Sequence, residues 1–217
     1  NGMLIHREVL KFNTCLKEIP TPVSFLNIEE LMQFYNYQYP KKDGILELSR
    51  DMFCFMAFTS IRYSDLKSLC WSDIHGKIME IVTEKTDERL QIELNDYALE
   101  ILKKYKKMKQ KGNHVFPPLS NQKLNSHLKE AALLAQLTKT WVDEYYIGND
   151  RIREEYKFYQ IISSHDGRRT FICCSLAFGI PHTVVMKWTG HRDYASMKPY
   201  IEISDKTKAA YMGKWNF

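Results

Sequence analysis

One stretch of the chain, residues 45–61, constrains the fold more than any other. It reads ILELSRDMFCFMAFTSI, and apolar side chains occupy most positions of its second half. A surface helix carries one apolar stripe, whereas a helix that is apolar on several sides must be enclosed by other elements. We therefore predict a central, mostly buried helix over residues 45–61.

Further helices are indicated by caps and by helix-breaking residues. Asn27, followed by an acid at Glu30, is typical of a helix start, and that helix should end before Pro40. Apolar spacing predicts additional helices from Asn95 to about Lys111, from Ser120 to about Leu137, from Ser163 or Ser164 to before Gly179, and from Thr183 to Trp188. Helices therefore make up most of the predicted structure.

Two segments have strand character. Residues 77–83 and 89–94 read KIMEIVT and RLQIEL, and the second alternates strictly between polar and apolar side chains. The polar residues 84–88 connect them as a hairpin, with 71–74 as a candidate third strand. Lys85 then lies near the hairpin tip, where lysines are usually solvated, although a long side chain can also reach into a groove. The predicted fold class is mainly α with a small antiparallel β-sheet (α+β).

Residues 138–159 are open to two interpretations. They fit two strands around a turn at Gly148-Asn149-Asp150, and they fit a loop insertion equally well. No internal repeat or Gly/Ser-rich linker divides the chain, so we expect one domain over residues 1–217. Residues 1–22 are expected to form a leading strap or linker, and residues 201–217 a C-terminal tail.

Composition excludes several classes of protein. The chain has 217 residues, 44% of them hydrophobic and 26% charged, which is ordinary for a globular protein with one sizeable core. Its five cysteines form no C-x-x-C motif, so we predict free thiols in a reducing cytoplasm rather than a disulfide scaffold or a zinc site. No apolar run approaches the roughly 18 residues of a membrane span. The net charge of +5 permits a nucleic-acid partner without requiring one.

The most chemically distinctive stretch is residues 165–200. His165 and Arg168 are three residues apart and share one face at the start of a predicted helix, where free N–H groups favour a phosphate. A Gly190-His191 pair and Tyr200 follow. Each of these signals is common in unrelated proteins. The chain contains neither an H-E-x-x-H metal motif nor a G-x-S-x-G nucleophile elbow.

Charged residues elsewhere are open to two interpretations each. Arg62 follows the buried helix, so it requires either an anion or solvent. A surface or capping pair with Asp65 is the simpler interpretation, and an anion-binding arginine is the alternative. The lysine-rich helix that follows Asn95 either presents a solvated face or contacts nucleic-acid phosphates through Lys103, Lys104 and Lys107.

In this order, the segments resemble those of the tyrosine recombinases, the phage-integrase family of mobile elements. The sequence TSIRYSDL resembles the family's first-arginine box, and HDGRRTF resembles its H-x-x-R box. The resemblance implies a nucleophilic tyrosine and five further catalytic residues, and the full set is Arg62, Lys85, His165, Arg168, His191 and Tyr200. It also implies supporting roles for Asp65 and for Arg169, which is the fallback for Arg168.

Two departures from the family pattern concern the site. Ser60-Ile61 and Thr189 stand where Gly-Leu and Leu are more frequent, and we expect these replacements to affect packing alone. Pro199 disfavours a helical conformation in the residue before it. We therefore expect Tyr200 to lie at a kink or at the start of a new helix rather than in the middle of one.

The resemblance implies the fold of a tyrosine recombinase catalytic domain and the activity of a site-specific recombinase or integrase. Such an enzyme cuts and rejoins double-stranded DNA through a covalent 3′-phosphotyrosine intermediate, with no metal or other cofactor. It implies a monomer without DNA, a tetramer on paired DNA sites, accessory DNA-bending or excision proteins, and action at the nucleoid of a prokaryotic cytoplasm. DNA-binding domains are expected to precede this sequence, and the tail is expected to pack on its own or a neighbouring protomer.

Two alternatives remain from the sequence. A type IB topoisomerase would use the same chemistry but rejoin the same strand, whereas a non-catalytic DNA-binding module would have lost that chemistry. The presence of all six candidate catalytic residues argues against the second alternative.

Overall fold

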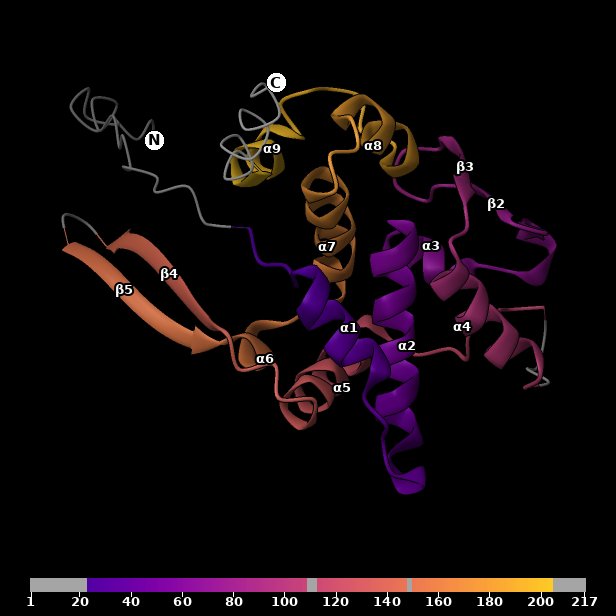
Figure 1. Ribbon diagram of the computed structural model, residues 1–217, viewed down its shortest axis with the longest axis horizontal. Helices are drawn as coiled ribbons and strands as arrows, with labels where there is room; N and C mark the ends of the chain where they lie inside the picture. Colours follow the sequence, from indigo (N-terminus) through magenta and orange to yellow (C-terminus); the bar gives the residue numbers. More distant parts are fainter. Residues whose placement is uncertain (1–22, 109–112, 148–149, 205–217) are drawn as a thin grey trace, which may run out of the picture.

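The computed structural model describes residues 23–108, 113–147 and 150–204, and helices dominate it (Figure 1). The α-helices and short 3-10 helices are α1 (Ile28–Asn36), η2 (Lys41–Asp43), α2 (Gly44–Thr59), α3 (Tyr63–Ser68), η3 (Trp71–Asp73), α4 (Asp96–Lys106), α5 (Asn121–Leu134), α6 (Phe158–Ile161), α7 (Ser164–Ala177), α8 (His182–Thr189) and α9 (Lys198–Ser204). The strands are β1 (Ile74–His75), β2 (Ile78–Val82), β3 (Arg89–Glu93), β4 (Thr140–Ile147) and β5 (Asp150–Lys157). The predicted fold class is confirmed. The predicted strap 1–22 and most of the predicted tail, residues 205–217, lie outside the described residues.

Helix α2 forms the centre of the fold, as its apolar sequence predicts. Its side chains are buried continuously from Ser49 to Thr59, and α1, α4, α5 and α7 pack around it (Figure 1). The helix ends at Thr59, before the predicted end at Ile61, because Ser60 adopts a left-handed conformation with a φ of 67°. This early end matters for the site, since it turns the chain just ahead of Arg62.

Helix α7 lies directly against α2 at Gly167. A Cβ atom at this position would lie 3.0 Å from the carbonyl oxygen of Phe53 and 3.1 Å from the Cβ atom of Met56. Contacts this short leave no room for a side chain unless the two helices move apart. Gly167 therefore sets the separation of α2 and α7.

The predicted hairpin forms strands β2 and β3 of a three-stranded antiparallel sheet with the order β1-β2-β3. Met79 lies opposite Ile92 and Ile81 lies opposite Leu90, and these four side chains form the buried face of the sheet. The third strand covers residues 74–75 rather than the predicted 71–74, because residues 71–73 form η3. The turn between β2 and β3 carries Lys85.

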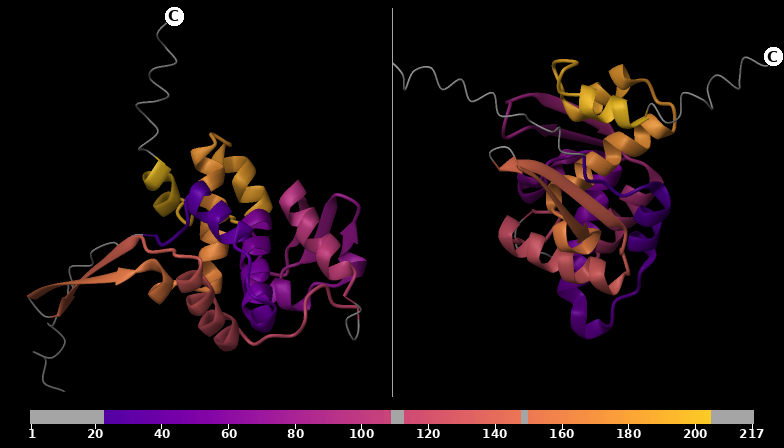
Figure 2. Two further views of the ribbon diagram at one scale, coloured as in Figure 1. Left: turned by 60° about the horizontal axis from the view of Figure 1, so that its bottom comes forward. Right: turned by 90° about the vertical axis from the view of Figure 1, so that its left-hand side faces the viewer.

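Residues 140–157 form a two-stranded ribbon, which settles the choice between strands and a loop insertion. Strands β4 and β5 are antiparallel, with Trp141 opposite Tyr156 and Tyr145 opposite Ile152. The ribbon projects away from the helical body (Figures 1 and 2). The Gly148-Asn149 part of the predicted turn lies outside the described residues.

Two further expectations concern free thiols and membrane-spanning segments. Cys54, Cys70, Cys173 and Cys174 are free thiols, as predicted, and Cys15 lies outside the described residues. No helix in the described part of the chain is both long and apolar enough to cross a membrane.

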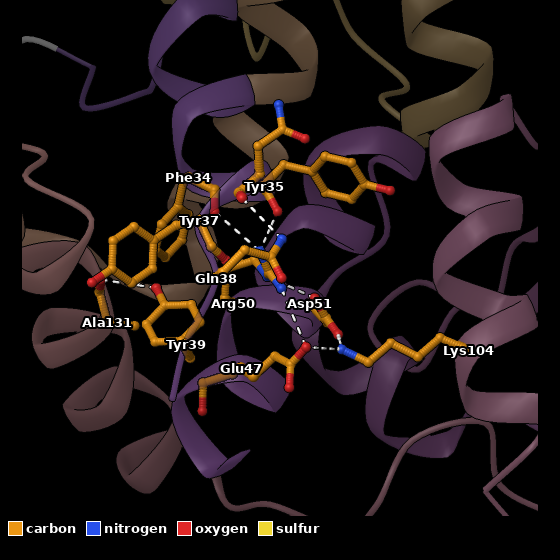
Figure 3. Close-up of polar contacts among 12 residues, drawn as sticks. Phe34, Tyr35, Tyr37, Gln38, Tyr39, Glu47, Arg50, Asp51, Lys104 and Ala131 are labelled. Carbon is orange, nitrogen blue, oxygen red and sulfur yellow. Dashed lines mark hydrogen bonds and ion pairs between the residues drawn. The ribbon is translucent and has the colours of Figure 1, made fainter. Parts of the chain in front are cut away.

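A buried arginine joins α1 to α2 (Figure 3). Arg50 donates hydrogen bonds to the carbonyl oxygens of Phe34, Tyr35 and Tyr37 at the end of α1, with distances of 3.3 Å to Phe34 and 3.0 Å to Tyr37. The last carbonyl groups of a helix have no partner within the helix, so Arg50 supplies the missing donors. Its Nε atom also lies 2.6 Å from Oδ1 of Asp51, which neutralises the charge.

Asp51 extends this network to α4 (Figure 3). Its Oδ2 atom accepts hydrogen bonds from Nζ of Lys104 at 2.6 Å and from the hydroxyl of Tyr105 at 3.0 Å. Lys104 also lies 2.5 Å from Glu47. The structure thus gives Lys104 two carboxylate partners within the protein, which differs from the DNA contact considered for it, whereas Lys103 and Lys107 are exposed on α4. Helix α4 ends at Lys106, earlier than the predicted end near Lys111, because residues 107–108 form a turn, and residues 109–112 lie outside the described residues.

Replacement of Asp51 by Asn should destabilise the fold strongly. Arg50 and Lys104 would lose the carboxylate between them, and breaking a buried ion pair by removing one partner costs about 3 kcal/mol or more. Urea denaturation monitored by circular dichroism measures the change in the free energy of unfolding. Asp96→Asn is the matched control, because the Lys77–Asp96 pair is almost fully exposed at 3.8 Å and should contribute very little. Equal effects of the two substitutions would contradict this account.

Candidate active site

The left-handed turn at Ser60 positions Arg62. The Ser60 N–H donates to the carbonyl of Met56 at 2.8 Å, and its hydroxyl donates to the carbonyl of Trp188 at 3.0 Å. The chain then places Arg62 immediately before α3, where its Nη1 atom is buried and has no hydrogen-bond partner among the described residues. The simpler interpretation from the sequence, a surface or capping pair with Asp65, is not supported, because no Arg62–Asp65 ion pair occurs among those of the described residues.

Arg168 is held rigidly by two backbone carbonyl groups. Its Nη1 atom donates to the Ser60 carbonyl at 2.8 Å, and its Nη2 atom donates to the Thr189 carbonyl at 2.5 Å. The side chain is 3% exposed, and burial followed by the neighbouring charge of Arg62 lowers the pKa of Arg168 to about 10. The repulsion that Arg168 experiences from the neighbouring guanidinium of Arg62 marks a positive site, which favours an anion.

Gly190 brings His191 to the same place. Gly190 ends α8 in the left-handed region with a φ of 63°, and a Cβ atom there would lie 3.0 Å from Oε2 of Glu88 and 3.2 Å from Leu90. Both the backbone conformation and the close approach of β3 therefore require glycine. The next residue, His191, has its Nδ1 atom 2.8 Å from Oγ1 of Thr189.

The hydrogen bonds of Thr189 determine the tautomer of His191. The Thr189 hydroxyl donates to the Val185 carbonyl at 2.8 Å, so its oxygen is free to accept the hydrogen of Nδ1. The Nε2 atom of neutral His191 then carries no hydrogen. Burial, followed by the charges of Arg168 and Arg62, lowers the pKa of His191 from 6.5 to about 4.

His165 lies in the first turn of α7, whose start is capped by Ser163 and Asp166. Desolvation by the surrounding protein, followed by the charge of Arg169, lowers the pKa of His165, and Arg168 and Arg62 act in the same direction. The ring nevertheless keeps an exposed edge, in contrast to the buried Arg168. His165 is therefore neutral at pH 7 and accessible from solvent.

Asp65 anchors the turn that carries Lys85. Its Oδ1 atom accepts the backbone N–H of Glu84 at 3.0 Å, although Asp65 itself is almost completely buried. The turn is closed by Thr83, whose hydroxyl lies 2.7 Å from that of Thr86. The Lys85 side chain is exposed and has no hydrogen bond or ion pair with the described residues, so it is free to move toward a bound ligand.

Tyr200 lies in the first turn of α9, directly after Pro199, in agreement with the predicted start of a new helix. The expectation that Pro199 keeps the preceding residue out of a helix is wrong, because Lys198 is the first residue of α9. Its backbone N–H donates to the carbonyl of Met197, a fully buried residue that packs with Ile172, Leu176 and Val185. The Tyr200 side chain packs against Ile172 and Leu176, on the face of α7 that also carries Arg169. Burial raises the pKa of Tyr200, and Arg169 partly offsets this effect.

Four of the six predicted catalytic residues act electrostatically on one another, and Tyr200 joins them through Arg168; the four are Arg62, His165, Arg168 and His191. Lys85 stands on the adjoining turn. The residues that the sequence did not identify are Ser60 and Thr189, which act through their carbonyl groups, and Ser24. Ser60 and Thr189 were expected to affect packing alone, but both bind Arg168. Residue patterns reveal side chains and give no signal for a backbone acceptor.

The described residues give no support for a metal centre. No group of three or more His, Cys, Asp or Glu side chains that could hold a metal ion occurs among the described residues. The polar groups of the site are instead mostly donors, which suit an anionic ligand.

Acidification should destabilise the protein, and His191 should account for part of the loss. Its pKa is about 4 in the fold and about 6.5 in the unfolded chain, so between these values the unfolded chain binds a proton that the native protein does not. Stability is therefore complete above about pH 6.5 and decreases as the pH falls toward 4. Urea denaturation from pH 7 to pH 4 should show a shallower decrease for His191→Gln than for the wild type. The exposed His75 provides the control, since His75→Gln should leave the pH dependence unchanged.

Comparisons with known proteins place this site in a family. A sequence profile of the phage integrase family matches residues 23–207. The structure of XerA recombinase has a TM-score of 0.63 and 15% identity, over 92% of this chain and 67% of that one. Tn1549 transposon integrase in complex with a circular intermediate DNA has a TM-score of 0.66 and 13% identity, over 89% and 66%. A lambda integrase (75-356) dimer bound to a COC' core site has a TM-score of 0.59 and 19% identity, over 82% and 59%.

Curated protein sequences give no significant match. The chain spans about two thirds or less of each of these three longer structures. At identities this low, the similarity of these structures shows a shared fold alone. The family profile covers nearly the whole described region, including every candidate catalytic residue. The chain belongs to the phage integrase family.

Proposed function

We propose that this chain is the catalytic domain of a site-specific DNA recombinase or integrase that forms a covalent 3′-phosphotyrosine intermediate. The observation that carries the proposal is the buried, unpartnered Nη1 atom of Arg62 beside the fixed guanidinium of Arg168. Leaving a buried donor unpaired is costly, so its presence indicates a ligand that supplies the acceptor. A DNA phosphate has the required charge and oxygen atoms.

The two arginines bind the non-bridging oxygens of the scissile phosphate. Negative charge accumulates on these oxygens when a fifth ligand approaches the phosphorus atom, and donors fixed in advance stabilise that charge most effectively. Arg168 is fixed by the carbonyls of Ser60 and Thr189 before any substrate arrives. His191 binds a non-bridging oxygen as well. Because its Nδ1 hydrogen is committed to Thr189, it donates from Nε2 only after protonation, which the phosphate charge favours by raising its pKa from about 4.

Tyr200 attacks the phosphorus atom through its phenol oxygen. The new bond joins that oxygen to phosphorus, the bond from phosphorus to the 5′-oxygen breaks, and His165 assists removal of the phenol proton. Lys85 donates a proton to the departing 5′-oxygen, for which its mobile position on the β2–β3 turn is suited. Attack by the 5′-hydroxyl of another strand reverses these steps and exchanges the strands, so the chemistry conserves the phosphodiester bond energy without a metal or other cofactor.

The assembly is proposed from relatives. Lambda integrase has been solved as a dimer on a core site, and XerH recombinase on a palindromic difH substrate. By analogy, this domain acts on double-stranded DNA as a tetramer on paired sites, with further DNA-binding domains in the same polypeptide and accessory DNA-bending or excision proteins as partners. The prokaryotic cytoplasm and its nucleoid are the corresponding location. Lys103 and Lys107 are exposed and available for contacts with the DNA backbone.

A covalent adduct is the direct test of the proposed function. The protein is incubated with a library of nicked duplexes in which the short strand beyond the cleavage site diffuses away, and adducts that resist SDS are isolated and their DNA is sequenced. The wild type should yield adducts, whereas Tyr200→Phe should yield none. Tyr194→Phe is the matched control, because Tyr194 is 54% exposed in the loop just before α9 and its replacement should not affect the yield. Wild-type protein without adduct would refute the covalent mechanism.

The role of Lys85 has a separate chemical test. Lys85→Met should slow adduct formation on ordinary DNA, because the departing 5′-oxygen is no longer protonated. A 5′-bridging sulfur leaves as a thiolate without a proton, since a thiol has a pKa of only about 8.5. The sulfur substrate should therefore restore the rate of Lys85→Met, and failure of this rescue would exclude Lys85 as the proton donor.

Plasmid relaxation separates the recombinase from a type IB topoisomerase. A topoisomerase relaxes supercoiled plasmid as a monomer and needs no special sequence, whereas a recombinase acts on paired sites. Plasmids with zero, one or two copies of the sequence recovered from the adducts should give recombinant products only with two copies. Efficient relaxation of the plasmid without a site would favour the topoisomerase.

A further inference from the structure

A second arginine of α7, Arg169, lies in a polar cluster that the proposed reaction does not use. Its Nη1 atom donates to Oγ of Ser24 at 2.8 Å and to Oδ1 of Asp166 at 3.1 Å. The Ser24 hydroxyl donates to the same Asp166 oxygen at 2.5 Å. Asp166 is 1% exposed, and its other oxygen accepts the backbone N–H of Ser163 at 2.7 Å. The guanidinium of Arg169 is thus fixed from two sides.

The cluster joins segments that are distant in the sequence. Residues 23–26 run along α7, where the Leu26 N–H donates to Oγ1 of Thr170 at 3.0 Å and the thiol of Cys174 donates to the Leu26 carbonyl at 3.5 Å. Ser24 therefore reaches Asp166 from a segment that is itself attached to α7. The Arg169 side chain is 33% exposed and lines a cavity of about 250 Å³ together with Trp141 and Asp143 of the β4–β5 ribbon.

The Tyr200 hydroxyl connects this cluster to the proposed reaction. Tyr200 packs against Ile172 and Leu176, which lie three and seven residues after Arg169 and therefore on the same face of α7. The charge of Arg169 acts on the Tyr200 phenol more strongly than that of Arg168. Neighbouring residues of an α-helix point about 100° apart, so Arg168 and Arg169 cannot serve the same ligand atom from the same side. Arg168 donates to the carbonyls of Ser60 and Thr189, whereas Arg169 donates to Ser24 and Asp166 on the face of α7 against which Tyr200 packs.

We propose that Arg169 binds the attacking oxygen of Tyr200 and holds it for reaction, and that Ser24 and Asp166 are positioning residues that act through Arg169. This inference rests on the proposed function of Tyr200 as the nucleophile. The two consecutive arginines then have different ligands: Arg168 binds the phosphate, and Arg169 binds the nucleophile. A cation that donates to the phenol oxygen also favours the phenolate, which is the reactive form.

The experiment measures single-turnover adduct formation at saturating DNA, with the DNA sequence recovered from wild-type adducts. Arg169→Gln should slow the reaction about tenfold to a hundredfold, because a hydrogen bond from a charged donor is lost, whereas the affinity for DNA should change little. Arg169→Lys should restore part of the rate. Arg153→Gln, on the exposed strand β5, is the matched control and should react like the wild type.

Three readouts distinguish this role from a merely structural one. Ser24→Ala should slow the reaction less than Arg169→Gln, and the double variant should be no slower than Arg169→Gln alone, because Ser24 acts through Arg169. The 5′-bridging sulfur substrate should not rescue Arg169→Gln, because attack rather than departure is impaired. The rise in rate that accompanies loss of the Tyr200 phenol proton should move to higher pH in Arg169→Gln, because Arg169 lowers the pKa of Tyr200 against the effects of burial and of Cys173.

The outcomes separate this inference from the proposed function. Wild-type protein without a Tyr200-dependent adduct would overturn both. A normal wild-type adduct together with an unchanged or faster rate for Arg169→Gln would overturn the role of Arg169 alone. Rescue of Arg169→Gln by the sulfur substrate would also overturn it, and so would a slow rate explained by an equal loss of folded protein in thermal unfolding.

Discussion

The guanidinium of Arg168 is the contact on which the arrangement of the site depends. It bonds the carbonyls of Ser60 and Thr189, which stand at the ends of α2 and α8. Both helices end with a left-handed residue, Ser60 and Gly190, and the final carbonyl groups of a helix have no donors of their own. One side chain from α7 therefore supplies donors to the ends of two other helices, which fixes all three relative to one another. The absence of a side chain at Gly167 allows α7 to approach α2 closely enough for this.

The same contact explains how the protein tolerates two neighbouring arginines in a buried place. Like charges at close range in a medium of low polarity are unfavourable, and the lowered pKa of Arg168 reflects this. Carbonyl dipoles compensate Arg168, but they leave its positive charge intact. Asp65, the nearby carboxylate, bonds the Glu84 N–H and therefore orders the Lys85 turn. The Asp65 carboxylate also offsets part of the charge on Arg168, but one carboxylate does not balance two guanidinium groups. The site thus retains a net positive charge, which favours an anion such as phosphate.

Local patterns predicted the elements well and predicted the site only in part. The buried helix, the capping box at Asn27 and the hairpin were predictable, because caps, periodicity and turns depend on neighbouring residues. The proline before Tyr200 likewise predicted the start of a new helix. Lys104 was different, because its ion pairs with Glu47 and Asp51 join residues that are far apart in the sequence. The same holds for Ser24 and Arg169, which are 145 positions apart, and no local pattern indicates such a pair.

The nucleophile and the first arginine lie against different parts of the hydrophobic core. Arg62 follows α2, within the large cluster that includes Phe53 and Phe55, whereas Tyr200 packs against a small cluster whose buried members are Ile172, Leu176, Val185 and Met197. A segment held by few buried contacts opens at a lower free energy than one held by many. Tyr200 can therefore shift relative to Arg62, while Arg168 stays fixed by the carbonyls of Ser60 and Thr189. The groups proposed to stabilise charge are thus fixed in advance, and the proposed contact with Arg169 would limit the motion of the one group that has to form a new covalent bond.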